Sequence, residues 1–136
     1  MTAAALDFRQ LPVEPDEGLP QHFSVPLGDA TYEFRLYANL TADRREPLEA
    51  IHDFAPAPSP AAPVSPDGFL VLRIDRRDAL GLETILLRKV VPDPELVHEA
   101  AELAVIVDRV EIARGNLNGS GSFGSAIDVW VARRWA

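Results

Sequence analysis

The sequence predicts a mainly β fold, namely a small β-barrel or β-sandwich of about six strands with one short helix. Apolar and polar residues alternate over several segments, which is the period of a half-buried strand. Glycine-containing turns separate some of these segments, as they do in hairpins. The chain has 136 residues, 47% of them apolar, which is enough for one domain with a hydrophobic core.

Residues 1–20 are predicted to form an extended N-terminal arm. They are acidic and broken by prolines, so regular structure is not expected in them. The arm either stays a free tail or becomes ordered against a partner chain, and the sequence leaves both open. Residues 21–136 are predicted as a single β domain. The isolated apolar side chains of the arm are candidates for contact with a partner: Leu6, Phe8, Leu11 and Val13.

The first predicted hairpin covers residues 22–37. Gly28 and Asp29 form its turn, since glycine at the first central position suits a turn that requires a positive φ there. Pro26 has no N–H to donate, so the first strand is expected at the edge of a sheet or to carry a break. On either side of the turn the apolar residues recur with a period of two: Phe23, Val25 and Leu27, then Tyr32, Phe34 and Leu36.

Residues 40–68 are predicted as a proline-rich loop. Prolines recur every two or three residues from Pro56 to Pro66, which favours an extended, polyproline-like conformation. The spacing PxxP occurs twice and is found in recognition motifs, but a surface insertion is the preferred interpretation.

Strands are expected on both sides of a polar turn after this loop. Residues 69–75 alternate, and residues 83–91 form an apolar run rich in branched side chains, so the two are predicted to make a second hairpin or a meander.

Asp93, Pro94 and Glu95 predict the start of the one short helix. Asp93 suits a helix cap, and Pro94 suits the first turn because its missing N–H needs no partner there. Apolar residues follow at helical spacing, so the helix is expected to continue to about Glu102.

The last third of the chain is predicted to contain two more strands. Residues 103–113 fit a long strand that is bent or bulged near Asp108, where the alternation shifts by one residue. Residues 114–124 form a loop of glycine, serine and asparagine, and residues 125–133 fit the final strand.

No catalytic, cofactor-binding or metal-binding residues are predicted. The chain has no cysteine, and its three histidines lack the spacing of a metal site. Gly119, Gly121 and Gly124 match GxGxxG, but a strand follows them where a dinucleotide site needs a helix. No serine occupies a nucleophile motif. The chain is therefore expected to be neither an enzyme nor a cofactor protein.

The charge and hydropathy patterns argue against two classes of partner. The net charge of −8 opposes nucleic-acid binding, which depends largely on neutralising phosphates. No segment has the length of a membrane span or the pattern of a secretory signal. The chain is expected to be soluble and made in the cytoplasm.

Several remaining features lie where a subunit would meet its neighbours. The glycine-rich loop contains Phe123, and exposed loop tips often make contacts. Arg133, Arg134 and Trp135 lie next to the last residue of the sequence, and Trp and Arg are enriched at interfaces. The alternative is that Trp130 packs on its own sheet and Trp135 frays at the terminus.

The segment 21–39, QHFSVPLGDATYEFRLYAN, resembles small phage tail proteins of the baseplate plug type. The shared features are a short strand, a tight turn and a Tyr-x-Phe-x-Leu strand that ends in Asn39. Residues 68–91 are similar in layout. The proline-rich stretch from Pro47 to Pro66 is longer than the family pattern, and the last third has no motif that aligns. The resemblance implies a β-barrel-like subunit at the end of a phage tail tube or a related injection machine, as one copy of a ring.

The resemblance and the missing catalytic residues together predict a non-enzymatic structural subunit. Its expected partners are other virion or tail proteins and copies of itself, and it would be made in the host cytoplasm and assembled into the tail. The alternative is a β-barrel or β-sandwich module that binds a small ligand or glycan, for which a deep apolar pocket with convergent polar groups is expected.

Overall fold

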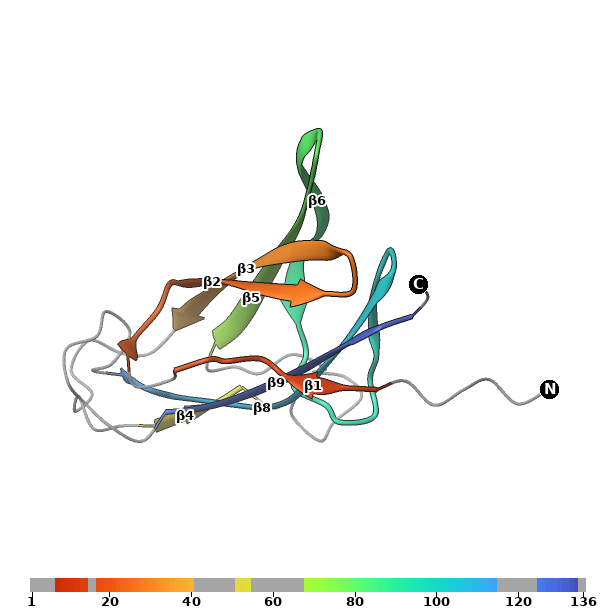
Figure 1. Cartoon of the computed structure of the whole chain (residues 1–136). Helices are drawn as coiled ribbons and strands as arrows, with labels where there is room; N and C mark the ends of the chain where they lie inside the picture. Colours follow the sequence, from red (N-terminus) through yellow and green to blue (C-terminus); the bar gives the residue numbers. More distant parts are fainter. Residues whose placement is uncertain (1–6, 15–16, 41–50, 55–67, 115–124, 135–136) are drawn as a thin grey trace.

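Strands make up most of the structure and lie in two antiparallel sheets (Figure 1). The computed structural model describes residues 7–14, 17–40, 51–54, 68–114 and 125–134. Sheet A has the strand order β1-β9-β8-β4, with β7 also paired to β8, and sheet B has the order β2-β3-β5-β6. The strands are β1 (Arg9–Gln10), β2 (Gln21–Leu27), β3 (Ala30–Leu40), β4 (Ile51–Asp53), β5 (Gly68–Asp78), β6 (Gly81–Val90), β7 (His98–Ala100), β8 (Leu103–Ala113) and β9 (Ala126–Arg133).

The two sheets face each other as the layers of a β-sandwich. No strand of sheet A pairs with a strand of sheet B in the part of the chain described, so the sandwich alternative applies rather than a closed barrel. In Figure 1, sheet B lies above sheet A, and the β5–β6 hairpin extends beyond sheet B, away from sheet A. The mainly β fold class is thus confirmed.

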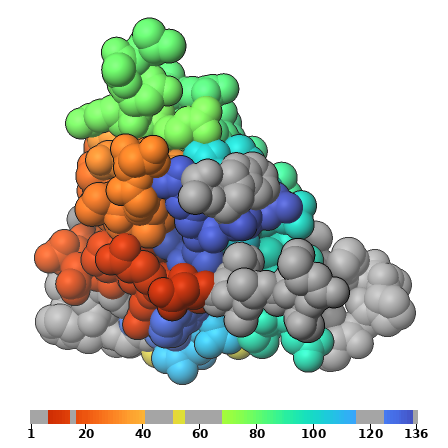
Figure 2. Space-filling model, turned by 45° about the vertical axis from the view of Figure 1, so that its right-hand side comes forward, coloured from red at the N-terminus to blue at the C-terminus, as the bar shows by residue number. Residues whose placement is uncertain are grey.

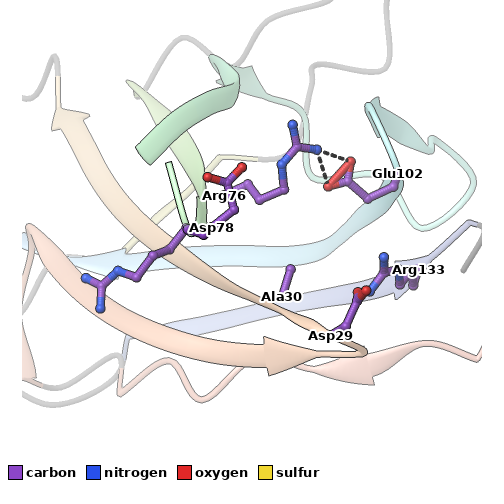
Figure 3. A pocket seen from close by; sticks show the side chains of 8 residues that line it. Asp29, Ala30, Arg76, Asp78, Glu102 and Arg133 are labelled. Atoms are coloured by element: carbon purple, nitrogen blue, oxygen red, sulfur yellow. Dashed lines mark hydrogen bonds and ion pairs between the residues drawn. The ribbon is translucent and has the colours of Figure 1, made fainter. Parts of the chain in front are cut away.

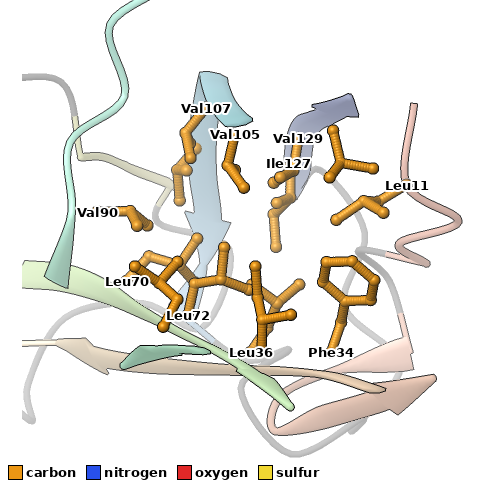
Figure 4. Close-up of a cluster of buried hydrophobic side chains, with 14 of the residues drawn as sticks. Leu11, Phe34, Leu36, Leu70, Leu72, Val90, Val105, Val107, Ile127 and Val129 are labelled. Atoms are coloured by element: carbon orange, nitrogen blue, oxygen red, sulfur yellow. The ribbon is translucent and has the colours of Figure 1, made fainter. Parts of the chain in front are cut away.

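The core lies between the sheets and is built by the alternation of the strands (Figure 4). In β3, Tyr32, Phe34 and Leu36 point inward and are fully buried, while the residues between them face outward. Sheet A contributes Val107 and Val129 from its central strands. Each such side chain contributes about 1.5 to 3 kcal/mol by leaving water.

The β2–β3 hairpin confirms the predicted turn. Leu27 pairs with Ala30, so Gly28 and Asp29 are the two turn residues, and the φ of Gly28 is +66°. As Pro26 predicts, β2 lies at the edge of sheet B. The predicted bulge in β8 is also confirmed, because the pairing with β9 shifts between Val107 and Arg109.

The predicted helix from Asp93 to Glu102 is wrong. Asp93 Oδ1 accepts the N–H of Glu95 at 2.9 Å, and the carbonyl of Asp93 accepts the N–H of Leu96 at 3.1 Å, so the cap residue closes a single turn. The chain then forms β7, which pairs with β8 through a tight turn in which Ala101 has a φ of +50°. A helix this short is marginal by itself, whereas β7 pairs with the edge of β8 from His98 opposite Val105 to Ala100 opposite Leu103.

Short strands account for the higher strand count. β4 falls within residues 40–68, where the sequence predicts a loop, and that prediction is wrong for Ile51–Asp53, which pair with Ala113, Ile112 and Glu111 of β8. The prolines from Pro56 to Pro66 lie outside the described residues.

Part of the segment expected as an N-terminal arm lies against the sandwich. Arg9 and Gln10 pair with Val131 and Trp130 of β9, and the N–H of Leu11 donates to the carbonyl of Val129 at 2.8 Å. Leu11 and Leu19 are both buried in the core.

Candidate functional site

The outer face of sheet B carries the most distinctive cluster of charged side chains. Strand alternation directs every second residue of β3 and β5 away from the core, among them Glu33 and Asp75. These two carboxylates lie directly opposite each other in the β3–β5 register. Both are nearly inaccessible, with exposed fractions of 4% and 1%. Two like charges in opposite positions are destabilising unless cations compensate them.

Three polar groups surround Asp75. Arg35 Nη1 donates to it at 2.9 Å, Arg73 Nε at 3.2 Å and Thr84 Oγ1 at 2.6 Å. Burial alone would raise the pKa of Asp75, but these hydrogen bonds and the positive charges of Arg73 and Arg35 outweigh it and hold the pKa below its usual value. Asp75 is therefore ionised at neutral pH and its oxygens are occupied.

Glu33 is held in the same way by a different set of side chains. Arg77 Nη2 lies 3.0 Å from Glu33 Oε1, His22 Nε2 lies 3.1 Å from it, and Ser24 Oγ donates at 3.4 Å. Burial would raise the pKa of Glu33, yet Arg77 and His22 keep it below the usual value. Neither carboxylate is poised to donate a proton, and their effect is to fix a set of arginines on the surface.

Exposed apolar side chains lie beside these arginines. Leu82 pairs with Arg77 and Leu87 pairs with Arg73 across β5 and β6, and the two leucines are 53% and 60% exposed. Tyr37 of β3 is 39% exposed on the same face. Arginines beside apolar and aromatic groups are typical of the centre of protein interfaces. We call this set, with Leu80 of the hairpin tip, the arginine–leucine surface: Tyr37, Arg73, Arg77, Leu80, Leu82 and Leu87.

The tip of the β5–β6 hairpin places Leu80 at the most exposed point of this surface. Asp78 pairs with Gly81, and Asp78 Oδ1 accepts the N–H of Leu80 at 2.8 Å. Ala79 and Leu80 are therefore the two central residues of the turn, and Gly81, whose φ is +127°, begins β6 directly after them. Leu80 is 97% exposed, and its side chain is not needed to form the turn. Figure 2 shows the hairpin, in green, standing above the rest of the molecule.

A second polar cluster lines a pocket at one end of the sandwich (Figure 3). Arg76 Nη1 lies 2.6 Å and 2.7 Å from the two oxygens of Glu102, and the hydroxyl of Tyr32 donates to Glu102 at 2.9 Å. Burial, together with Glu102, raises the pKa of Tyr32 to about 12. Burial would raise the pKa of Glu102, but the hydrogen bonds from Arg76 and Tyr32 keep it low.

The charges in this pocket are largely matched. Arg133 Nη1 donates to the carbonyl of Leu27 at 2.8 Å and to Asp29 Oδ1 at 2.9 Å. Three arginines face three carboxylates, and alanines are the apolar lining residues. A small-molecule site is usually lined mainly by apolar side chains, so this pocket does not have the expected composition. Its hydrogen bonds join the β2–β3 turn to β9 through Arg133, and the β7–β8 turn to β5 and β3 through Glu102.

The structure separates the interface residues predicted from the sequence. Leu11 lies in the core and Val13 packs against it, while Phe8 is half-buried. Arg133 contacts Leu27 and Asp29, and Arg134 donates to the carbonyl of Ala101 at 3.1 Å. Three of the predicted residues lie outside the described ranges: Leu6, Phe123 and Trp135.

Sequence reasoning did not predict the arginine–leucine surface. A leucine within the turn sequence Asp78 to Gly81 was the available signal, because turns of this kind favour polar residues and glycine. The contact between β3 and β5 joins segments separated by the proline-rich region, and the sequence does not reveal that pairing.

The described ranges contain no group of three or more His, Asp or Glu side chains arranged to hold a metal ion. No helix in those ranges is both long and apolar enough to cross a bilayer. Comparison with protein-family models, with characterised proteins and with solved structures gives no match to this chain.

Proposed function

We propose that this chain is a non-enzymatic structural subunit of a phage tail, a baseplate or a related tail-like particle, acting through protein–protein contacts. The observation that carries the proposal is the arginine–leucine surface, in which Leu80 is 97% exposed at the tip of a projecting hairpin. Exposed leucines gathered at Leu80, Leu82 and Leu87 support contact with another protein.

The resemblance of residues 21–39 to baseplate plug proteins supplies the class of particle. Its partners would be other tail proteins and copies of itself, and the protein would be made in the host cytoplasm before assembly into the tail. The pocket of Figure 3 gives no support to the alternative of a small-ligand or glycan module, because its lining is mainly charged.

The buried acids have the ionisation of structural ion pairs, which is the use that the proposal gives them. Asp75, Glu33 and Glu102 have lowered pKa values and several hydrogen-bond donors each, and Tyr32 has a raised pKa. A general acid or base works best with a pKa near the working pH, and these groups are displaced from it.

The test uses the organism that encodes the chain. Tail-like particles are induced, purified on a density gradient and examined by mass spectrometry and by cryo-electron microscopy with an antibody against the chain. We expect the chain to migrate with the particles and the antibody to label one end of the tail. Deletion of the gene should leave particles without functional tails. Fully functional particles that lack the chain would refute the proposal.

A further inference from the structure

The two outer faces of the sandwich differ in their charge balance. On the outer face of sheet B, four cations accompany two carboxylates, and both carboxylates are buried beneath the arginines. The carboxylates are Glu33 and Asp75, and the cations are Arg35, Arg73, Arg77 and Lys89. This face therefore presents cations and exposed leucines, although the whole chain has a net charge of −8.

The outer face of sheet A has the opposite balance around a smaller apolar centre. Ile106 and Trp130 are half-buried and pair across β8 and β9. Next to them, Glu111 and Asp128 share Arg109, whose Nε lies 3.8 Å and 4.0 Å from their carboxylate oxygens. The side chains of the two acids are 32% and 36% exposed. Apolar groups with a surplus of acid fit a partner that has apolar groups with a surplus of arginine.

We infer that the arginine–leucine surface binds a second copy of this chain. The surface of one copy docks on the outer face of sheet A of the other copy. This inference rests on the proposed function, because it names the partner of the surface proposed there. The two complementary faces lie on opposite sides of the sandwich (Figure 1), so one molecule cannot join them itself. Contact between unlike faces is heterologous, and it continues from copy to copy until the arrangement closes into a ring or extends as a filament.

The available area predicts a weak contact between isolated copies. Sheet A is the smaller face, because β1, β4 and β7 are short; at about 3.4 Å per residue and about 4.8 Å between strands, its strands cover roughly 450 Å². Two such faces cover about 900 Å², near the small end for specific interfaces. We therefore expect association in the micromolar range or weaker, which the high local concentration within a particle would reinforce.

The test measures the mass of the purified full chain by sedimentation velocity from micromolar to millimolar concentration. Wild type should form dimers and larger species. The double variant Leu82→Glu/Leu87→Glu impairs one face and Glu111→Lys/Asp128→Lys impairs the other, so each variant alone should remain a monomer. An equimolar mixture should form a 1:1 dimer and nothing larger, because it contains one intact copy of each face. Leu96→Glu and Glu95→Lys, in the β6–β7 connection, are matched controls that should associate as wild type does.

A second measurement does not depend on charge reversal. The chain has no cysteine, so Leu82→Cys and Asp128→Cys each introduce a single thiol. Mild oxidation of their mixture should give mixed disulfide dimers at least tenfold faster than either variant alone. Thermal denaturation of every variant checks that it is folded.

Three results would overturn the inference: a wild type that stays monomeric throughout, a sheet A variant that associates normally, or cross-linking no faster in the mixture. The particle experiment is independent of all three. A chain that is present at the tail end but monomeric in solution would retain the proposed function and lose this inference. A chain that self-associates but is absent from particles would retain this inference and lose the proposed function.

Discussion

Glu33 and Asp75 are buried although they lie on the solvent side of sheet B. Outward positions of a strand normally carry exposed polar side chains, yet Glu33 and Asp75 are almost fully covered. The guanidinium groups of Arg35 and Arg73 lie 2.9 Å and 3.2 Å from Asp75, and that of Arg77 lies 3.0 Å from Glu33. The acids thereby hold the arginines in place on the surface that we propose as a contact site.

Of the two carboxylates that bind Arg76, Glu102 is expected to contribute more to the free energy of unfolding than Glu83. Glu102→Gln removes the charge that faces Arg76 but keeps an oxygen for the hydroxyl of Tyr32. We expect a loss of about 2 kcal/mol in the free energy of unfolding, measured by urea denaturation, because the side chain of Glu102 is 8% exposed.

Glu83→Gln is the matched control, since Glu83 binds the same arginine but is 65% exposed. An exposed ion pair of this kind contributes about 0.5 kcal/mol or less. Equal effects of the two substitutions would show that burial of Glu102 does not strengthen its interaction with Arg76.

His98 is expected to make the protein less stable in mild acid. Burial lowers the pKa of His98 below its usual value of 6.5; a hydrogen bond with the backbone of Val91 opposes this in part, and the nearby positive charge of Arg88 adds to it. The unfolded chain therefore takes up a proton at a higher pH than the folded chain does, so the free energy of unfolding falls as the pH drops through about 6.5.

Urea denaturation between about pH 7.5 and 5.5 measures this slope, with His98→Gln as the comparison. Glutamine does not titrate, so the variant should lose the part of the slope that belongs to His98. A variant with the full wild-type slope would assign the effect to other groups.

At the scale of elements, the β3–β5 pairing depends on Gly68. Its φ is +153°, and a Cβ at this position would lie 2.1 Å from the carbonyl oxygen of Asn39. Gly68→Ala should therefore destabilise the protein by about 2 kcal/mol or more, measured by thermal and urea denaturation. The backbone of β3 would have to move to accept the methyl group.

Gly81→Ala separates this clash from backbone strain. The φ of Gly81 is +127°, but no atom lies within 4 Å of a Cβ built there. We expect Gly81→Ala to be clearly less destabilising than Gly68→Ala. Equal losses would mean that φ alone limits both positions.

Long strands could be predicted from the sequence because each contains several alternating side chains. The hairpin at Gly28 and the bulge near Asp108 could be located for the same reason, since they interrupt a clear pattern. The sequence around Asp93 does not distinguish a helix from an isolated turn, because an aspartate that accepts nearby N–H groups begins both. Tertiary pairing of β7 with β8 decides between them.

The candidate surface was less predictable than the strands. Alternation predicts which side of its own strand each of Arg73, Leu87 and Tyr37 occupies. Only the strand order and register place all three on one face of the sheet. The apolar residues Leu11 and Val13 look available for a partner in the sequence, yet they satisfy the core of their own chain.

At the scale of the whole molecule, the sandwich separates charge between its two sides. The hydrophobic core fixes the two sheets back to back, so the outer faces point in opposite directions (Figure 1). A surplus of arginine on one face and of acid on the other gives each copy a direction. Subunits with such a direction associate head to tail, whereas a single self-complementary patch gives closed pairs.

Salt should weaken this association if the unlike faces attract each other. Raising sodium chloride from about 0.15 M to about 1 M shortens the Debye length from about 8 Å to about 3 Å. At 0.15 M the repulsion between two chains of net charge −8 is already largely screened, so the further change acts on charges in contact. We expect the apparent Kd from sedimentation to rise several-fold. Arg73 and Arg77 would be responsible, because the leucines beside them do not respond to ions in this way. Association that strengthens over the same range would instead show that Leu80, Leu82 and Leu87 drive the contact by burial alone, and the charge complementarity between the faces would be refuted.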